Sequence, residues 1–364
     1  MNNTTVQMKY INGLKGLACL MVMIGHFISI YKSAENFPAD SKFLQLFDTF
    51  IKSKLGFIID ETFWVILFFF VSGYLVSLSK TPDIKSLFFK SFSRFLRLGL
   101  PVLFACAIIF IINKGFGFYT YGTLNIFKNS FIQKHYLNNF SLWQVIKSPI
   151  DVLILGKYDF CSPYWVLREM YITSLIIYVF SLLKSKINTN LFVVFWGVSL
   201  VGSIILSNVV FTGLLGMTLN FIQNEKTKTF INNKLFLVFS LALCLSLFVI
   251  PKSRIASVFF GALVLIVPKI NILNAIFSSK VAQFINKMSF GIYSFHWPVL
   301  CSFGMYILIK THENIGLINS VIVSSIASVV ITITISILYY YLLEKQIYKG
   351  LKTLDTLWKK KTGQ

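Results

Sequence analysis

Acidic residues are scarce in this chain. Only 13 Asp and Glu residues stand against 34 Lys and Arg residues, which gives a formal net charge of +21 at pH 7. A charge of this size can indicate nucleic-acid binding, but the basic residues lie in short segments between apolar runs rather than on a polar domain. Membrane topology explains that distribution better, and we therefore expect no nucleic-acid partner.

Cysteine is also rare and shows no metal-binding or redox pattern. None of the five cysteines forms a CxxC pair or another metal-like spacing. We therefore expect no disulfide framework, no zinc site and no other bound metal. Cys161 stands just before an apolar run, and the other four lie inside apolar runs: Cys19, Cys106, Cys244 and Cys301.

Signatures of several other protein classes are missing. No small-residue cleavage site follows the first apolar run, so we expect that run to be retained rather than removed as a signal peptide. No internal repeat, Gly/Ser linker or low-complexity segment divides the chain. We expect one polytopic membrane domain over residues 1–350 and a short basic cytoplasmic tail over residues 351–364.

Apolar residues are abundant instead. Hydrophobic residues make up 56% of the chain and aromatic residues 16%, and the mean hydropathy is +0.73, which is typical of a polytopic membrane protein. We predict an all-α integral membrane protein with about ten transmembrane helices. The predicted spans are 14–31, 62–79, 95–113, 164–183, 190–206, 208–222, 234–250, 254–268, 289–309 and 317–343.

The basic residues predict the orientation. An even number of spans places both termini on one side, and lysines and arginines are concentrated in residues 80–97 and after residue 343. The positive-inside rule therefore predicts that both termini are cytoplasmic. The long connection from Lys114 to Pro163 then faces outward. Its aromatic start, GFGFYTYG, could stack against a sugar or form an interfacial belt, and both interpretations remain open.

Two ionisable residues lie in the first apolar run. Lys15 and His26 are eleven residues apart, so on a helix they share a face and lie ~16 Å apart along the axis. Ionisable groups at membrane depth usually face a bundle interior or a wet cavity, and a partly desolvated histidine can act as a general base. In the alternative interpretation, the Lys15 side chain extends to the inner lipid headgroups and His26 only packs against neighbouring helices.

Two further segments flank the first basic connection. Ser72 and Gly73 interrupt the bulky run that ends the second span, where small residues favour close helix packing. The chain has no GxSxG elbow, so Ser72 is not expected to be a nucleophile. Arg94 and Arg97 lie three residues apart at the cytoplasmic start of the third span and could bind phosphates, or could simply anchor the span.

The segment SPYWVLREMYITS opens the fourth span at its outer end. It holds Arg168 and Glu169 shortly after Tyr164 and Trp165. Adjacent residues on a helix do not face each other, so Arg168 and Glu169 need separate partners. Glu169 is predicted at about the depth of His26, where a carboxylate would orient the imidazole and stabilise its protonated form.

The ninth span contains the last polar group, in SFGIYSFHWPVL. Here His296 and Trp297 precede Pro298 in the inner half of the predicted helix. The proline interrupts the backbone hydrogen bonds of the helix. In a membrane this is tolerated mainly where a cavity or a neighbouring helix satisfies the unpaired backbone groups.

Taken together, these segments resemble the bacterial inner-membrane acyltransferase-3 family over nearly the whole chain. The opening GLKGLACLMVMIGH is similar to the family's basic residue, apolar run and histidine, with Lys15 where the family has arginine. PYWVLREMY resembles the Trp-to-Glu segment, although Glu169 follows Trp165 by four positions where many relatives use five. The other matching residues are Ser72, Gly73, Arg94, Arg97, Pro101, Ser289, Tyr293, His296, Trp297 and Pro298.

The resemblance implies an O-acyltransferase of the bacterial inner membrane. It implies an acyl-CoA donor, usually acetyl-CoA, bound from the cytoplasm, and a glycan or lipid-linked sugar as acceptor. His26 would then be the catalytic base and Glu169 its carboxylate, while Lys15, Arg94 and Arg97 would bind the donor. The expected supporting residues are Ser72, Tyr164, Trp165, Arg168, Ser289, Tyr293, His296 and Trp297.

A transporter or flippase for a glycan or a small anionic metabolite is the competing hypothesis. Such a protein would also place His, Glu and Arg inside the membrane, as proton relays or substrate ligands. The chain shows no evident inverted repeat, which favours the acyltransferase.

Overall fold

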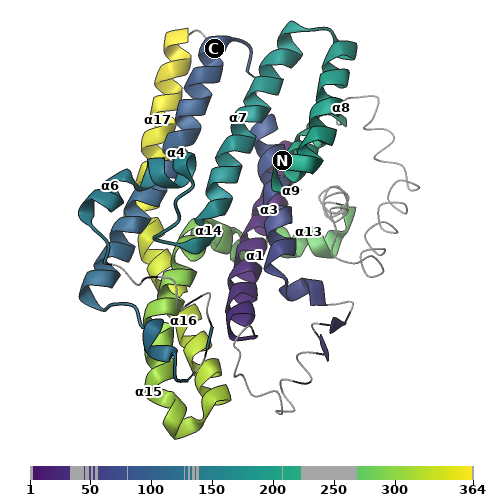
Figure 1. Cartoon of the computed structure of the whole chain (residues 1–364). Coiled ribbons are helices and arrows are strands. Elements are labelled where there is room, and N and C mark those ends of the chain that lie inside the picture. The colour runs from purple at the N-terminus through teal and green to yellow at the C-terminus, as the bar shows by residue number, and fades with distance from the viewer. Residues whose placement is uncertain are drawn as a thin grey trace. The chain divides into compact units, whose positions relative to one another are not determined.

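The computed structural model describes residues 3–32, 45, 49–50, 52–53, 56–79, 81–126, 128–129, 132, 136, 139–206, 208–222 and 269–362 (Figure 1). Helices dominate this part of the chain, and none of its residues lies in a strand. The predicted all-α class is therefore confirmed for the described residues. The α-helices are α1 (Asn3–Lys32), α3 (Glu61–Ser77), α4 (Ile84–Gly115), α6 (Leu142–Ile150), α7 (Trp165–Lys186), α8 (Thr189–Leu206), α9 (Asn208–Ile222), α13 (Asn271–Ser278), α14 (Lys280–Val299), α15 (Met305–Ile315), α16 (Leu317–Tyr339) and α17 (Lys345–Thr362).

Short 3₁₀ and π-helical turns connect several of these helices. The 3₁₀ turns are η1 (Gly56–Ile59), η2 (Tyr121–Thr123) and η4 (Ser162–Tyr164). The π-helical turns are η3 (Asp151–Leu155), η6 (Leu300–Gly304) and η7 (Tyr340–Glu344), and each of them directly continues an α-helix.

The chain forms two compact units. The first consists of Met1–Ala18, Ile51–Arg94 and Glu169–Asn286, and the second of Cys19–Phe50, Phe95–Arg168 and Lys287–Gln364. Helices α1, α4, α7 and α14 each contribute residues to both units.

The first unit is organised around α3 and α9, which pack side by side (Figure 1). Their approach depends on glycine, because a Cβ on Gly73 would collide with the backbone carbonyl of Gly213, and one on Gly216 would collide with that of Phe70. This contact confirms that Gly73 serves helix packing, as expected of small residues in membrane helices. Two apolar clusters surround the pair, with α1 residues such as Tyr10 and Leu14 in one and Trp196 of α8 in the other.

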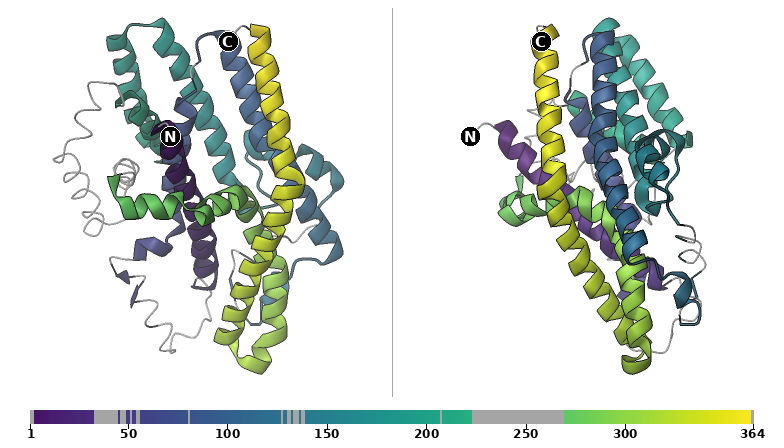
Figure 2. Two further views of the ribbon diagram at one scale, coloured as in Figure 1. Left: turned by 180° about the vertical axis from the view of Figure 1, so that it is seen from behind. Right: turned by 90° about the vertical axis from the view of Figure 1, so that its left-hand side faces the viewer.

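The second unit contains the C-terminal helices. Helix α15 packs against α16, and α16, η7 and α17 form one continuous rod (Figure 2). Five small polar residues follow each other at four-residue spacing on one buried face of α16: Ser320, Ser324, Ser328, Thr332 and Ser336. A Cβ on Gly291 would lie 2.9 Å from the Ser336 Cα, so α14 and α16 touch through their smallest residues.

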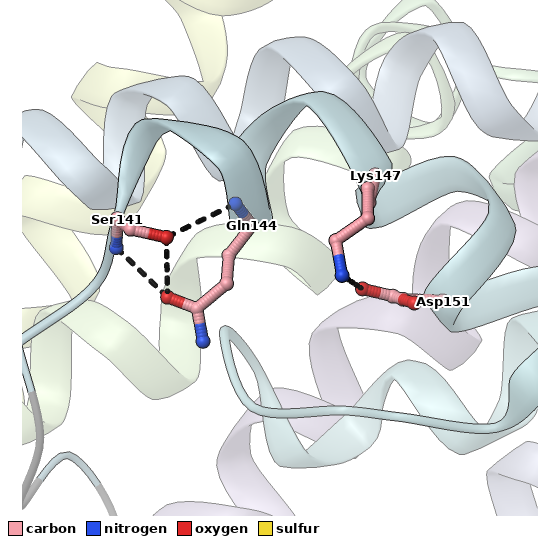
Figure 3. Close-up of polar contacts among 4 residues, drawn as sticks. All are labelled: Ser141, Gln144, Lys147 and Asp151. Atoms are coloured by element: carbon pink, nitrogen blue, oxygen red, sulfur yellow. Dashed lines mark hydrogen bonds and ion pairs between the residues drawn. The ribbon is translucent and has the colours of Figure 1, made fainter.

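Helix α6 begins with a complete capping box (Figure 3). The Ser141 hydroxyl accepts a hydrogen bond from the Gln144 amide, and the Gln144 side chain accepts one from the Ser141 amide at 2.8 Å. At the other end of α6, Lys147 lies 3.9 Å from Asp151. The caps satisfy backbone groups that a helix end would otherwise leave unpaired.

Among the described residues, five helical stretches are long and apolar enough to cross a membrane: Lys9–Tyr31, Ile84–Gly115, Ser162–Lys186, Lys280–Ile315 and Leu317–Lys361. They contain the predicted first, third, fourth, ninth and tenth spans. Helix α3, which holds most of the predicted second span, is a shorter apolar helix. The predicted spans at 234–250 and 254–268 lie outside the described residues.

Two segments outside the predicted spans are helical. The connection between Lys114 and Pro163 contains α6 and η3. The residues after Leu343 are also helical, because α17 extends the tenth span to Thr362. Hydropathy finds only apolar runs, so it misses amphipathic helices such as these.

Candidate functional site

The second unit brings the two predicted membrane histidines together. His26 of α1 stacks on His296 of α14 with ring centroids 5.3 Å apart and an interplanar angle of 16°. The indole of Trp297 meets the His26 ring edge-on at 5.9 Å, and Phe27 lies 6.4 Å from His296. Segments 270 residues apart in the chain therefore form one cluster, which we call the histidine pair (His26 and His296).

The two rings have different surroundings. His296 is fully buried, whereas His26 is partly exposed. The Nδ1 atom of His296 lies 3.0 Å from the carbonyl oxygen of Ile292. Because a carbonyl only accepts, this geometry assigns the hydrogen to Nδ1 and leaves a lone pair on Nε2 when the ring is neutral. Nε2 has no hydrogen-bond partner among the described residues.

Pro298 lies just after the histidine pair and changes the helix type. Proline removes a backbone donor, and α14 passes into the π turn η6 at Leu300. The Ser302 hydroxyl donates to the Pro298 carbonyl at 2.7 Å, so a side chain satisfies the backbone at this point. The sequence prediction that Pro298 loosens the local ladder agrees with this π turn.

Two tyrosines continue the cluster away from His26. The Tyr293 ring centroid lies 6.2 Å from those of His296 and Tyr164. The Tyr293 hydroxyl donates to the carbonyl of Pro163 in η4. The Tyr164 side chain is fully buried at the start of the fourth span.

The backbone of α14 is tied to α1 beside the cluster. The Cys19 thiol donates to the Ser289 carbonyl at 3.0 Å. Ser289 therefore contributes a backbone oxygen to this contact. Farther along α1, the Tyr31 hydroxyl lies 3.0 Å from the Ser324 hydroxyl of α16.

Predicted donor-binding residues in the first unit contact polar and aromatic groups. The Arg94 guanidinium donates to the hydroxyls of Ser174 at 3.0 Å and Ser72 at 3.4 Å, which joins α4 to α7 and α3. Lys15 places its ammonium 5.5 Å from the centre of the Phe68 ring. Ser72 thus serves as a hydrogen-bond acceptor for arginine, a role that sequence reasoning did not assign.

Arg97 has a different partner from Arg94. It forms an ion pair of 3.6 Å with Asp355 of α17, and the two side chains are 48% and 33% exposed. The prediction that Arg94 and Arg97 bind one ligand together stays a prediction. Arg94 contacts α7 and α3, whereas Arg97 contacts α17. The three-residue spacing of the two arginines did not indicate that Asp355 is the partner of Arg97.

The remaining predicted residues surround the start of α7. Trp165 is its first residue and is partly exposed. Arg168 packs against Gly156, where a Cβ would lie 3.2 Å from the Arg168 Cδ. Gly156 has φ of 70°, a conformation that glycine adopts without strain. Glu169 belongs to the first unit, and its predicted role toward His26 stays a prediction.

The aromatic start of the 114–163 connection packs against protein. Phe116 stacks on Phe303 with centroids 4.2 Å apart, and Phe118 stacks on Tyr136 at 3.8 Å. The Tyr136 hydroxyl also donates to the Phe160 carbonyl at 2.8 Å. These contacts lie within the second unit. The two interpretations of the segment, a sugar platform and an interfacial belt, stay predictions.

Four of the five cysteines lie in the part of the chain that the structure describes. Cys19, Cys106, Cys161 and Cys301 are free and buried thiols, and Cys244 lies outside this part of the chain. Burial raises the pKa of the Cys161 thiol well above its usual range, so this thiol stays protonated and is a poor nucleophile. No group of three or more potential metal ligands occurs in the part of the chain that was searched.

Comparison with protein families gives one match. A family model described as an acyltransferase domain matches residues 8–341, which is nearly the whole chain. The matched range includes every residue from Lys15 to Trp297 discussed above and ends before α17. Neither the curated proteins nor the solved structures include a match.

Proposed function

The chain belongs to the acyltransferase-3 family and is an acyltransferase, and we propose that it transfers an acetyl group from cytoplasmic acetyl-CoA to a glycan. The acceptor would be a sugar hydroxyl of a cell-surface or exported glycan, free or linked to lipid. The apolar helices and the family support a membrane protein, and we propose the bacterial inner membrane as its location.

The histidine pair is the observation that carries this proposal. Acyl transfer to a hydroxyl needs a base that removes a proton at neutral pH, and imidazole is the side chain best suited to that. His26 is the more accessible of the two rings. It is therefore the base that a substrate could reach, and His296 supports it from the buried side.

The proposed step balances as follows. The sugar oxygen attacks the thioester carbonyl carbon while His26 takes the hydroxyl proton. The carbon–sulfur bond then breaks, and the CoA thiolate leaves with a proton returned from the imidazolium. Because the two imidazoles are stacked, protonating both would place two positive charges side by side, which costs more free energy than protonating one. The pair is thus suited to handling a single proton.

Other residues are assigned on the family resemblance. Glu169 is the proposed carboxylate that stabilises the imidazolium, and Lys15, Arg94 and Arg97 are proposed to bind the donor's phosphates. Arginine suits phosphate because its guanidinium offers several donors in one plane. Arg94 donates through Nε and one Nη to serine hydroxyls, which fixes the position of its guanidinium.

Transfer of label from acetyl-CoA tests the proposal. Purified protein in detergent, supplied with [acetyl-¹⁴C]acetyl-CoA and an acceptor glycan, should release CoA and label the glycan. His26→Ala should lower the rate by ~10²–10⁴. His312→Ala is the matched control, since His312 lies in α15 outside the pair and caps its own helix through the Ile309 carbonyl.

The outcomes separate the possibilities. Full activity of His26→Ala at normal protein level would remove His26 from the mechanism. If wild-type protein neither transfers nor hydrolyses the label but moves glycan across vesicles, the transporter hypothesis replaces this one.

A further inference from the structure

Helix α17 carries the densest positive charge among the described helices of the second unit, and it lies after the end of the family match. It contains six lysines and one acidic residue, Asp355: Lys345, Lys349, Lys352, Lys359, Lys360 and Lys361. Six positive charges less one negative charge leave a net charge of +5. This charge needs an explanation beyond helix packing.

The helix has a packed side and a charged side. Leu351 is buried at 4% exposure, and Leu354 is partly buried. Lys352 and Lys359 are both exposed and lie seven residues apart, with Asp355 between them at i+3. Residues at i, i+3 and i+7 share one helical face, so the two lysines flank Asp355, ~10 Å from each other along the axis.

Asp355 also draws a third cation to this face. Arg97 of α4 lies 3.6 Å from the Asp355 carboxylate. One carboxylate therefore stands among three cations, Arg97, Lys352 and Lys359. Exposed pairs of this kind contribute little stability. This pair does fix Arg97 against the face of α17 on which helical spacing places Lys352 and Lys359.

Helix α17 continues the rod beyond the unbroken apolar run. That run ends at Leu343, and α17 extends for a further 18 residues (Figure 2), or ~27 Å. Apolar residues such as Leu351 and Leu357 lie among its lysines. Arg97, beside Asp355, is predicted at the cytoplasmic start of the third span. The cations around Asp355 therefore stand near the membrane boundary, where a phosphate can belong to a soluble molecule or to a lipid headgroup.

We propose that Arg97, Lys352 and Lys359 form a binding site for the phosphate groups of a soluble acyl donor. The inference rests on the proposed function, which supplies acetyl-CoA as a donor bearing several phosphates. Asp355 is a positioning residue that keeps Arg97 against α17. The two lysines, as compact point charges on flexible stems, would contact separate phosphates.

Equilibrium binding tests the site without catalysis. The full chain in neutral detergent is titrated with labelled CoA and with 3′-dephospho-CoA at low and moderate salt. In Lys352→Gln with Lys359→Gln, the Kd for CoA should rise roughly 3- to 30-fold, and its dependence on salt should weaken. The preference for CoA over 3′-dephospho-CoA should also shrink.

A matched pair of lysines controls for charge alone. Lys114→Gln with Lys310→Gln removes one exposed lysine from the C-terminal turn of α4 and one from the middle of α15. Its Kd for CoA should equal that of the wild type. If the α17 pair leaves the Kd unchanged, or the control pair raises it equally, the site is wrong.

Two further outcomes are distinguishable. Wild-type protein with no affinity for CoA would overturn the proposed donor and this site with it. If the α17 substitutions change only the stabilisation by added phosphatidylglycerol and not the Kd for CoA, the ligand is a lipid headgroup and the proposal of a soluble ligand fails.

Discussion

At the scale of single residues, hydrogen bonds that join distant segments hold the candidate site in place. The Tyr293 hydroxyl donates to the Pro163 carbonyl, and the Cys19 thiol donates to the Ser289 carbonyl. Neither bond can be predicted from sequence, because each joins a side chain to a backbone oxygen more than 100 residues away. Tyr293 itself could be predicted as a site residue, since it belongs to the motif from Ser289 to Trp297. The Pro163 carbonyl as its hydrogen-bond partner could not.

Removing the Tyr293 hydroxyl should affect stability more than chemistry. In Tyr293→Phe the Pro163 carbonyl loses its donor, and a loss of about 1–3 kcal/mol is expected. Thermal unfolding in detergent measures it. Tyr121→Phe is the control, because Tyr121 is 66% exposed and should melt like the wild type. A Tyr293→Phe variant that keeps full stability but loses acyl transfer would instead make this hydroxyl catalytic.

Asp83 provides a pH-dependent contribution at the start of α4. Its carboxylate accepts the Ser86 amide at 2.7 Å, and this bond lowers the pKa of Asp83 from its ordinary 3.8. Because the folded-state pKa is the lower one, the stabilisation is present above pH 3.8 and is lost as pH falls through the lowered pKa.

Asp83→Asn removes this titration while keeping an oxygen acceptor. The melting-temperature advantage of wild type over Asp83→Asn should be constant from pH 7 to about 5 and should shrink as pH falls below about 4. The same difference at every pH would show that Asp83 does not titrate with folding.

At the scale of elements, five of the ten spans predicted from apolar runs lie in described helices that are long and apolar enough to cross a membrane. The runs did not predict where these helices end. The third predicted span begins at residue 95, whereas α4 begins at Ile84. Its first turns carry Lys85, Lys90 and Arg94, so hydropathy excludes them although they are helical. The same physical reason hides α6 and α17, whose apolar residues occupy one face only. Helical periodicity, not mean hydropathy, is the signal that could have revealed them.

Close packing of α3 on α9 is sensitive to a single methyl group. A Cβ on Gly73 would collide with the Gly213 carbonyl, which is backbone and cannot rotate away. Gly73→Ala should therefore cost about 1–3 kcal/mol. Detergent-solubilised protein should melt earlier, and its yield from membranes should fall.

Gly197→Ala in α8 is the matched control for this effect. A Cβ there meets no atom of the described residues within 4 Å, so the substitution should be neutral or should stabilise by ~0.5–1 kcal/mol through helix propensity. Equal losses at both positions would mean that Gly73 matters for a reason other than α3–α9 packing.

At the scale of the whole molecule, charge predicts which side of the membrane each end of the α16–α17 rod occupies. Lysines concentrate in α17, so the positive-inside rule places α17 in the cytoplasm and the α15–α16 turn outside. The proposed function depends on this orientation, because the proposed cytoplasmic donor and the proposed exported acceptor would enter from opposite sides.

Cysteine labelling tests the orientation with little background. The four described cysteines are buried, and Cys244→Ser removes the fifth. In that background, an impermeant maleimide should label Asn314→Cys in intact cells, because Asn314 is exposed in the last turn of α15. It should label Thr353→Cys, which is exposed on α17, only after the membrane is opened. Labelling of Thr353→Cys in intact cells would place α17 outside, and acetyl-CoA could then not reach Arg97 and its lysines from the cytoplasm.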